Sequence, residues 1–202
     1  FWRGDGGAGA LATRLAGSTD IFGHHATRSI NFVAAHDGFT LRDAVSFIER
    51  RNDANGEDNQ DGHRDEVSWD AGSDEARRRD AKALLATLFA ARGTIMLTAG
   101  DEFGRTQGGN NNAYAQDNHI VWLDWSARDG ELEDYVAQLA EWRAAHPELA
   151  DPAIRHDLRW QRLDGGAMAP ADWDDAAGFV MPLPEGAGIR IDRDARAVHY
   201  IG

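Results

Sequence analysis

Hydrophobic residues recur along the chain in patterns that predict alternating helices and strands. Within residues 8–15, Leu11 and Leu15 share one helical face, and Gly17 follows as a glycine that can end the helix. Residues 29–35 (SINFVAA) are apolar on both alternating faces, a pattern typical of a parallel strand covered on each side. A short apolar run of this kind is also compatible with a helix.

This apolar run stops on the tripeptide His36-Asp37-Gly38. Thr40 follows as a plausible N-cap of a helix over residues 41–51 (LRDAVSFIERR), in which apolar positions recur at helical spacing. We therefore expect a strand–turn–helix unit that carries a histidine and a carboxylate at the carboxyl end of its strand.

The same order of elements recurs further along the chain. Residues 75–93 (EARRRDAKALLATLFAARG) place apolar residues on one helical side, with acidic charge at the start and glycine at the end. Residues 94–99 (TIMLTA) predict a second buried strand, which is followed by Asp101 and Glu102. A third helix is expected over residues 131–145.

Beyond Pro152 the pattern changes to short alternating pieces (DLRWQRL, GFVMPL and IRIDRDARAVHYI) that predict antiparallel strands. The expected fold is α/β, with one domain over residues 1–150 and a small β-rich domain over residues 151–202. Residues 51–72 and 104–118 fit neither helix nor strand. Loops of such length are usually functional or disordered.

Composition excludes several classes of partner. The formal net charge is -13, from 34 acidic against 21 basic side chains. Such a charge repels nucleic acid and anionic membranes, and no apolar run approaches the roughly 20 residues of a spanning helix. The absence of cysteine excludes disulfides and thiolate sites and fits a reducing compartment such as the cytoplasm. Because the first residue is Phe1 and FWRGDGG lacks the features of a signal peptide, we expect the chain to start inside a longer protein.

The ends of the predicted strands hold the main candidates for chemistry. In α/β barrels and doubly wound sheets, the active site lies at the carboxyl ends of the strands. His36 and Asp37 occupy such a place, although Asp37 could instead cap the next helix while His36 packs locally. Asp101 and Glu102 could bind sugar hydroxyls or a metal, but a structural role, such as an ion pair with Arg105, is favoured.

The acidic loop NDANGEDNQDGHRDE invites comparison with a helix–loop–helix calcium site, but the template fails. Counted from Asp53, the sixth position is Asp58 instead of glycine; counted from Glu57, the twelfth position is Ser68. The histidines show no metal spacing, and neither a phosphate loop nor a nucleophile elbow is present. We expect no metal and no cofactor.

Two tryptophans lie in HIVWLDW, a short apolar stretch. They could stack on sugars, but core packing is the default for such residues.

Four ordered motifs carry a resemblance to a known family. INFVAAHDGFTLRDAVSF resembles the fourth conserved region of the α-amylase family, on the seventh strand of a (β/α)8 barrel, and GTIMLTAGDEFG is similar to the eighth strand. NDANGEDNQDG and GNNNAYAQDN resemble the bacterial glycogen-debranching, isoamylase-type subgroup, which hydrolyses α-1,6 branch linkages. FWRGDGG with LATRLAGSTDIF resembles the segment before the seventh strand, so the likeness is collinear from Phe1 to about Trp125.

The resemblance implies a role for each matched residue. Asp37 would be the family's transition-state carboxylate, which grips sugar hydroxyls and is not the nucleophile, and His36 would hydrogen-bond the sugar where the bond breaks. The other implied substrate contacts, in the loop beside the cleft, are Asn111, Asn112, Asp117 and Asn118. The implied partner is glycogen or a branched malto-oligosaccharide.

The resemblance also implies that part of the catalytic set lies elsewhere. No stretch of the sequence matches the family's nucleophile or general acid, which lie on the fourth and fifth strands. The expected protein is therefore the C-terminal portion of a debranching hydrolase: the last part of a (β/α)8 barrel, with about strands seven and eight, followed by an incomplete β domain. It would need the missing N-terminal part of the barrel as its partner. The alternatives are a non-catalytic glucan-binding or regulatory barrel remnant and, less favoured, an α-1,4 amylase or transglycosylase.

Overall fold

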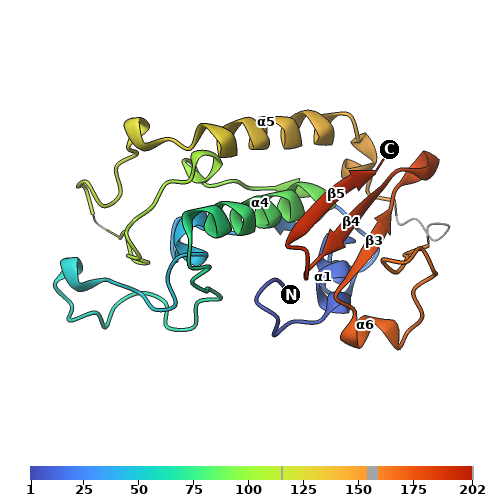
Figure 1. Cartoon of the computed structure of the whole chain (residues 1–202), viewed down its shortest axis with the longest axis horizontal. Coiled ribbons are helices and arrows are strands. Elements are labelled where there is room, and N and C mark those ends of the chain that lie inside the picture. Colours follow the sequence, from blue (N-terminus) through green and yellow to red (C-terminus); the bar gives the residue numbers. More distant parts are fainter. Residues whose placement is uncertain (115, 154–158, 202) are drawn as a thin grey trace. The chain divides into compact units, whose positions relative to one another are not determined.

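The computed structural model describes residues 1–114, 116–153 and 159–201 (Figure 1). Helices and strands alternate in the first part, and a small antiparallel sheet closes the described chain. The helices are α1 (Ala8–Leu15), α2 (Thr19–Phe22), α3 (Leu41–Ala44), α4 (Asp74–Ala90), α5 (Gly130–Ala144) and α6 (Asp172–Asp175). The strands are β1 (Ile30–Asn31), β2 (Thr94–Ile95), β3 (Gly178–Pro182), β4 (Gly188–Asp192) and β5 (Ala197–Ile201).

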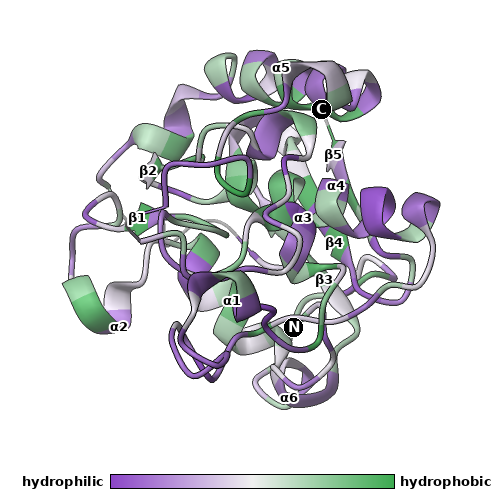
Figure 2. Ribbon diagram, turned by 90° about the vertical axis from the view of Figure 1, so that its left-hand side faces the viewer, coloured by the Kyte–Doolittle hydropathy of each residue, from purple (hydrophilic) through white to green (hydrophobic). Residues whose placement is uncertain are grey.

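Three predicted helices are confirmed, as α1, α4 and α5. The buried side of α4 includes Leu85, Leu88 and Phe89, and the hydropathy along the ribbon is shown in Figure 2. Gly93 takes a φ of +91°, a left-handed conformation that glycine adopts without steric cost and that suits the end of a helix.

The helix predicted after Thr40 is much shorter than expected. It spans only Leu41–Ala44, because the next carbonyls are used by another segment. The amide of Trp69 donates to the carbonyl of Ala44 at 2.9 Å, and the amide of Ala71 donates to the carbonyl of Val45 at 3.1 Å. Those carbonyls would otherwise accept the next bonds of the helix.

The two predicted parallel strands do pair in parallel, but over only two residues each. Ile30 lies opposite Thr94, and Asn31 lies opposite Ile95. The remaining residues of the runs 29–35 and 94–99 are extended or irregular. Apolar composition predicted where the strands lie, but it could not predict how far their ladder extends.

The prediction that the first strand is covered on both faces is wrong. Ile30 is 62% exposed and Phe32 is 54% exposed. Within the described residues this sheet consists of β1 and β2, so no further strand flanks either of them. None of the described helices combines the length and the apolar character needed to cross a membrane.

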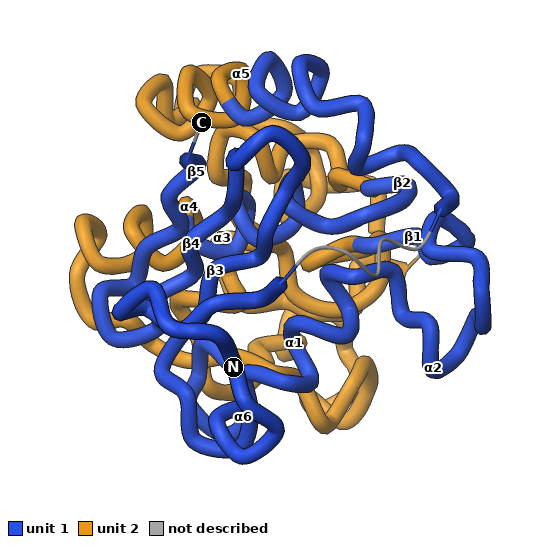
Figure 3. Tube along the Cα trace, turned by 90° about the vertical axis from the view of Figure 1, so that its right-hand side faces the viewer, with its two compact units in different colours: residues 1–31, 83–95, 139–202 blue, residues 32–82, 96–138 orange. Residues whose placement is uncertain are grey.

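Contacts divide the chain into two compact units, coloured separately in Figure 3. The first comprises Phe1–Asn31, Ala83–Ile95 and Leu139–Gly202, and the second comprises Phe32–Lys82 and Met96–Gln138. The domain boundary expected at residue 150 stays a prediction.

The first unit contains an antiparallel sheet formed by two of the three pieces predicted for the C-terminal region, GFVMPL and IRIDRDARAVHYI. Of the third piece, DLRWQRL, residues 157–158 lie outside the described residues, and Gln161 forms only isolated bridges. Strands β3, β4 and β5 lie side by side in that order, with Phe179 opposite Ile191 and Ile189 opposite Tyr200 (Figure 1). Phe179 is fully buried, and the rings of Trp160 and Trp173 lie 5.4 and 5.6 Å from its ring centroid. The alternating pattern beyond residue 178 therefore produces a core on one face of the sheet.

The second unit contains α3, the two long polar loops and the first turns of α4 and α5. Its core is formed by buried apolar side chains, including Phe39, Leu41, Val45, Phe103 and Leu132. Most of these follow directly after the two predicted strands, so the core lies next to the strand-end residues singled out from the sequence.

Candidate functional site

His36 and Asp37 lie in the turn that follows β1, and both side chains are open to solvent. The His36 side chain is 91% exposed and that of Asp37 is 55% exposed, and His36 Nε2 lies 3.5 Å from Asp37 Oδ2. The hydroxyl of Thr98 donates to the carbonyl of Ala34 at 2.8 Å, so the segment after β2 holds the segment that leads into the turn. A ligand could reach both functional groups without displacing a core residue.

Thr40, and not Asp37, caps the helix that follows. Thr40 Oγ1 accepts a hydrogen bond from the Asp43 amide at 3.1 Å and donates to the carbonyl of Arg105 at 3.1 Å. The alternative in which Asp37 caps α3 while His36 packs locally is therefore wrong. Asp37 and His36 make no capping contact with α3, which leaves them available for other chemistry.

Gly38 fastens the His36-Asp37 turn to the second polar loop. It has a φ of +86°, and its amide donates to the carbonyl of Asn111 at 3.0 Å. A Cβ atom at this position would lie 2.9 Å from Glu66 Oε1. Glycine thus suits the left-handed backbone, and a Cβ atom there would displace the end of the Glu66 side chain.

The second strand-end pair, Asp101 and Glu102, stabilises backbone. Asp101 is 2% exposed, and its Oδ1 accepts the amide of Leu41, the first residue of α3, at 3.1 Å. Glu102 Oε2 accepts the amide of Gly100 at 2.7 Å. The structural role favoured from the sequence is confirmed, although backbone amides are the partners found here.

Burial raises the pKa of Asp101 to about 6, despite the opposing effect of the hydrogen bond from Leu41. A raised pKa means that ionisation of Asp101 disfavours the folded state, so its contribution to stability is complete below about pH 4 and is lost as pH rises through about 6. We expect Asp101→Asn to remove this part of the decline, on the order of 3 kcal/mol. Urea unfolding at several pH values between 4 and 7 gives the free energy of unfolding of both proteins. If this free energy depended on pH in the same way for both proteins, the prediction would be contradicted.

Asn52 and Asn111 form a reciprocal amide pair between the two long loops. Asn52 Oδ1 accepts the backbone amide of Asn111, and Asn52 Nδ2 donates to Asn111 Oδ1, both at 2.9 Å. Asn111 Nδ2 donates to the carbonyl of His63 at 2.9 Å and to Glu66 Oε1 at 3.0 Å. Asn52 is fully buried and Asn111 is 1% exposed, so these bonds satisfy amides that would be costly to bury alone.

A second set of contacts extends the pair. Asp61 Oδ2 accepts hydrogen bonds from Asn55 Nδ2 and Asn112 Nδ2, each at 2.7 Å, and Asn110 Nδ2 donates to Asn55 Oδ1 at 2.7 Å. The bonds from Asn55 and Asn112 lower the pKa of Asp61, which keeps this acceptor ionised. We call Asn52, Asn55, Asp61, Asn110, Asn111 and Asn112 the amide network.

Asp117 and Asn118 lie in the turn beyond the amide network. Asn118 Nδ2 donates to Gln116 Oε1 at 2.7 Å, and its Oδ1 accepts the amide of Ile120 at 2.9 Å. Asp117 Oδ1 accepts the indole Nε1 of Trp122 at 2.8 Å. Both side chains thus accept hydrogen bonds from residues of the HIVWLDW stretch.

Not all of the predicted site residues have the same relation to the His36-Asp37 turn. Asn111 is tied to it through Gly38, and Asn112 joins the same network. Asn118 reaches that network only through Gln116, which donates to Asn55 Oδ1 at 3.1 Å, and Asp117 bonds Trp122. Direct contact with a substrate stays a prediction for all of them. Sequence reasoning missed Asn52, because its partner Asn111 lies 59 positions away and the composition of a loop does not reveal which of its side chains pair.

Metal ligation has no support in the described part of the chain. No group of three or more His, Cys, Asp or Glu side chains there is arranged to hold a metal ion.

Comparison with known proteins identifies relatives over most of the chain. It is 46% identical over 178 residues to a glycogen debranching enzyme from Erwinia tasmaniensis, a match that covers 82% of this chain and 26% of the relative. A glycogen debranching enzyme from Serratia proteamaculans is 45% identical over 191 residues, with 88% and 28% covered. The chain thus spans about a quarter of the length of these relatives. No family model matches it.

Solved structures with a similar fold are pullulanases. A pullulanase variant from Paenibacillus barengoltzii complexed with maltotetraose gives a TM-score of 0.65 at 21% identity, covering 99% of this chain and 33% of the other. A type I pullulanase from Bacillus subtilis complexed with maltose gives 0.64 at 22% identity, covering 96% and 24%. At this identity the likeness concerns the fold alone. The sequence matches show that the chain is homologous to a segment of bacterial glycogen debranching enzymes.

Proposed function

We propose that this chain is the C-terminal part of an enzyme that hydrolyses α-1,6 branch linkages of glycogen or its limit dextrin. The observation that carries the proposal is the 46% identity to a glycogen debranching enzyme over 178 residues. In this proposal β1 and β2 are the seventh and eighth strands of a (β/α)8 barrel, and residues 151–202 begin a β-rich domain. The reducing, cytoplasmic compartment favoured by the cysteine-free sequence is part of it.

Asp37 is the proposed transition-state carboxylate, and His36 is the proposed sugar contact beside it. Glycoside hydrolysis passes through an oxocarbenium-like state in which positive charge develops on a distorted ring. A fixed carboxylate that also binds hydroxyls helps most at that moment. The exposure of both side chains and the anchoring of Gly38 to Asn111 support this assignment. The nucleophile and the general acid come from the barrel part outside this chain.

The predicted loop residues contribute in two ways. Asn111 uses its buried side chain inside the amide network and acts through its carbonyl, which holds the peptide next to Asp37. Asn112, Asp117 and Asn118 are only partly buried or exposed and remain the proposed substrate contacts.

The isolated chain separates this proposal from its main alternative. The 202-residue polypeptide is expected to release no reducing ends from glycogen phosphorylase limit dextrin, because this proposal places the nucleophile and the general acid outside the chain. A polypeptide extended toward its amino terminus to the length of the curated relatives is expected to debranch the same substrate. A reducing-end assay on both proteins measures this.

Turnover by the short chain would contradict the proposed division of catalytic groups. An extended protein that folds and binds glucan but hydrolyses nothing would favour the non-catalytic, glucan-binding alternative.

A further inference from the structure

A cavity of about 860 Å³ lies in the second unit, among residues from α3, the start of α4, the loop after Asp101 and the start of α5. This volume falls within the range of roughly 300–1,000 Å³ that small-molecule sites occupy. Neither His36 nor Asp37 is among the described residues that line it. We call it the Trp122 groove and define it by Arg78, Arg105, His119, Trp122, Asp124 and Asp129.

Trp122 supplies the groove with an exposed aromatic surface. The default expectation for the tryptophans of HIVWLDW was core packing, but Trp122 is 62% exposed. Its indole N–H donates to Asp117 Oδ1 at 2.8 Å, which holds one edge of the ring in place. The face of an aromatic ring carries partial negative charge and attracts the weakly positive C–H groups of a sugar ring.

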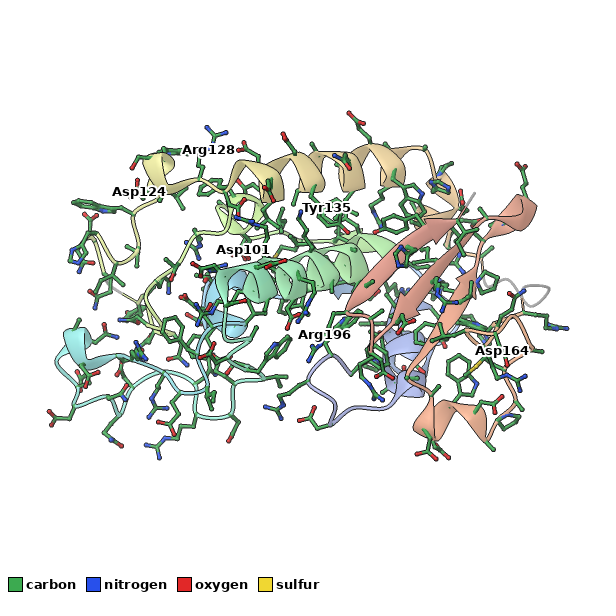
Figure 4. All side chains as sticks on the ribbon, in the orientation of Figure 1. Asp101, Asp124, Arg128, Tyr135, Asp164 and Arg196 are labelled. Atoms are coloured by element: carbon green, nitrogen blue, oxygen red, sulfur yellow. The ribbon has the colours of Figure 1, made fainter. Side chains whose placement is uncertain are left out.

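Several polar side chains of the groove, though not Arg105 with its unpaired buried Nε, are held by partners within the protein. Arg78 Nε donates to Asp129 Oδ2 at 2.6 Å, and Arg78 also pairs with Glu131 at 3.3 Å. Asp124, labelled in Figure 4 near Arg128, accepts hydrogen bonds from the hydroxyl and amide of Ser126 that lower its pKa. The groove thus presents fixed, ionised hydrogen-bonding groups.

The charges of the groove cancel. Four lining side chains are cationic (Arg42, Arg78, Arg105 and Arg128) and four are anionic (Asp74, Asp124, Asp129 and Glu131). A groove without excess charge gives no advantage to a phosphate or a cationic ligand. Planar charged groups beside an exposed indole suit a neutral ligand with many hydroxyls.

We infer that the Trp122 groove binds a linear α-glucan chain, with one sugar ring stacked on Trp122 and its hydroxyls bonded by Asp124 and Asp129. This is a second glucan contact, separate from the His36-Asp37 turn. The choice of an α-glucan among neutral polyols rests on the proposed function; the stacking and the hydroxyl contacts rest on the groove.

The experiment is a titration of the 202-residue chain, labelled with 5-fluorotryptophan, with maltoheptaose, followed by ¹⁹F NMR. The ¹⁹F resonance of Trp122 is the one that disappears in Trp122→Phe. Its chemical shift is expected to change as maltoheptaose is added and to level off when the groove is saturated. Trp125 supplies the control because it is 63% exposed, as Trp122 is 62% exposed, yet does not itself line the groove. Its ring contacts two lining residues, Phe103 at 5.2 Å and Arg128 at 6.0 Å, so the control substitution is Trp125→Phe, which keeps an aromatic ring against them. By isothermal titration calorimetry, Trp122→Ala is expected to weaken the Kd about tenfold, whereas Trp125→Phe changes it by less than about twofold.

Circular dichroism spectra matching that of the unmodified chain establish that each exposed-site variant folds. A Trp122 resonance unchanged at saturating maltoheptaose, or equal Kd values for Trp122→Ala and Trp125→Phe, would overturn the inference. An equal response to cellohexaose would overturn the α-glucan assignment. These outcomes are independent of the debranching assay. The groove can fail to bind maltoheptaose although the longer protein debranches limit dextrin, and it can bind maltoheptaose although the longer protein does not debranch limit dextrin.

Discussion

Asp37→Asn is expected to lower the kcat of the proposed longer debranching enzyme by about a hundredfold to a thousandfold, roughly the effect of removing one group that stabilises a charged transition state. Asparagine keeps the size and the hydrogen-bonding oxygen of the side chain but loses its negative charge. The lost charge matters most when positive charge develops on the sugar ring, so kcat and kcat/KM should fall together while KM changes little. Initial rates on limit dextrin, measured across substrate concentration, give both constants.

The matched control for this substitution is Asp20→Asn. The Asp20 side chain is 53% exposed, close to the 55% of Asp37, and it forms a surface ion pair with Arg14. Removing a surface carboxylate of this kind should leave kcat unchanged within about twofold. If Asp37→Asn retained the activity of the control, the carboxylate would have no role in the transition state, and the assignment drawn from the family resemblance would be wrong.

Long periodic segments of the fold could be predicted from the sequence. The helices near residues 8–15, 75–93 and 131–145 have an apolar stripe or clear end signals, and these properties are local. The predicted lengths of the parallel strands and of the helix after Thr40 are too long, because the ends of these elements depend on distant partners. The amides of Trp69 and Ala71 end α3 by donating to the carbonyls of Ala44 and Val45, and no local sequence pattern predicts these two contacts.

The candidate site shows the same division between local and distant information. The position of His36 and Asp37 after a strand could be predicted, because a polar tripeptide after an apolar run is a local signal. The burial of Asn111 could not, since it depends on Asn52 in another loop. The exposure of Trp122 could not either, because an apolar stretch carries no information about which of its faces the rest of the chain covers.

Gly62→Ala is expected to destabilise the chain by at least about 3 kcal/mol, because it combines backbone strain with disruption of the amide network. Gly62 has a φ of +75°, and a Cβ atom there would lie 2.3 Å from Asn111 Oδ1 and 2.7 Å from Asn52 Nδ2. Neither amide can move away freely, because both are buried and the two are hydrogen-bonded to each other at 2.9 Å. Urea unfolding followed by circular dichroism measures the loss.

Gly56→Ala separates the two contributions. Gly56 belongs to the same loop and has a similar φ of +79°, but a Cβ atom there would meet nothing within 4 Å. Its substitution should cost about 1–2 kcal/mol, the strain of a left-handed alanine alone. The difference between the two variants therefore measures how rigidly the Asn52–Asn111 pair is held. Equal losses would mean that the amide pair yields to the added methyl group, and a network that yields so easily could not hold the Gly38 peptide and the neighbouring Asp37 in a fixed position.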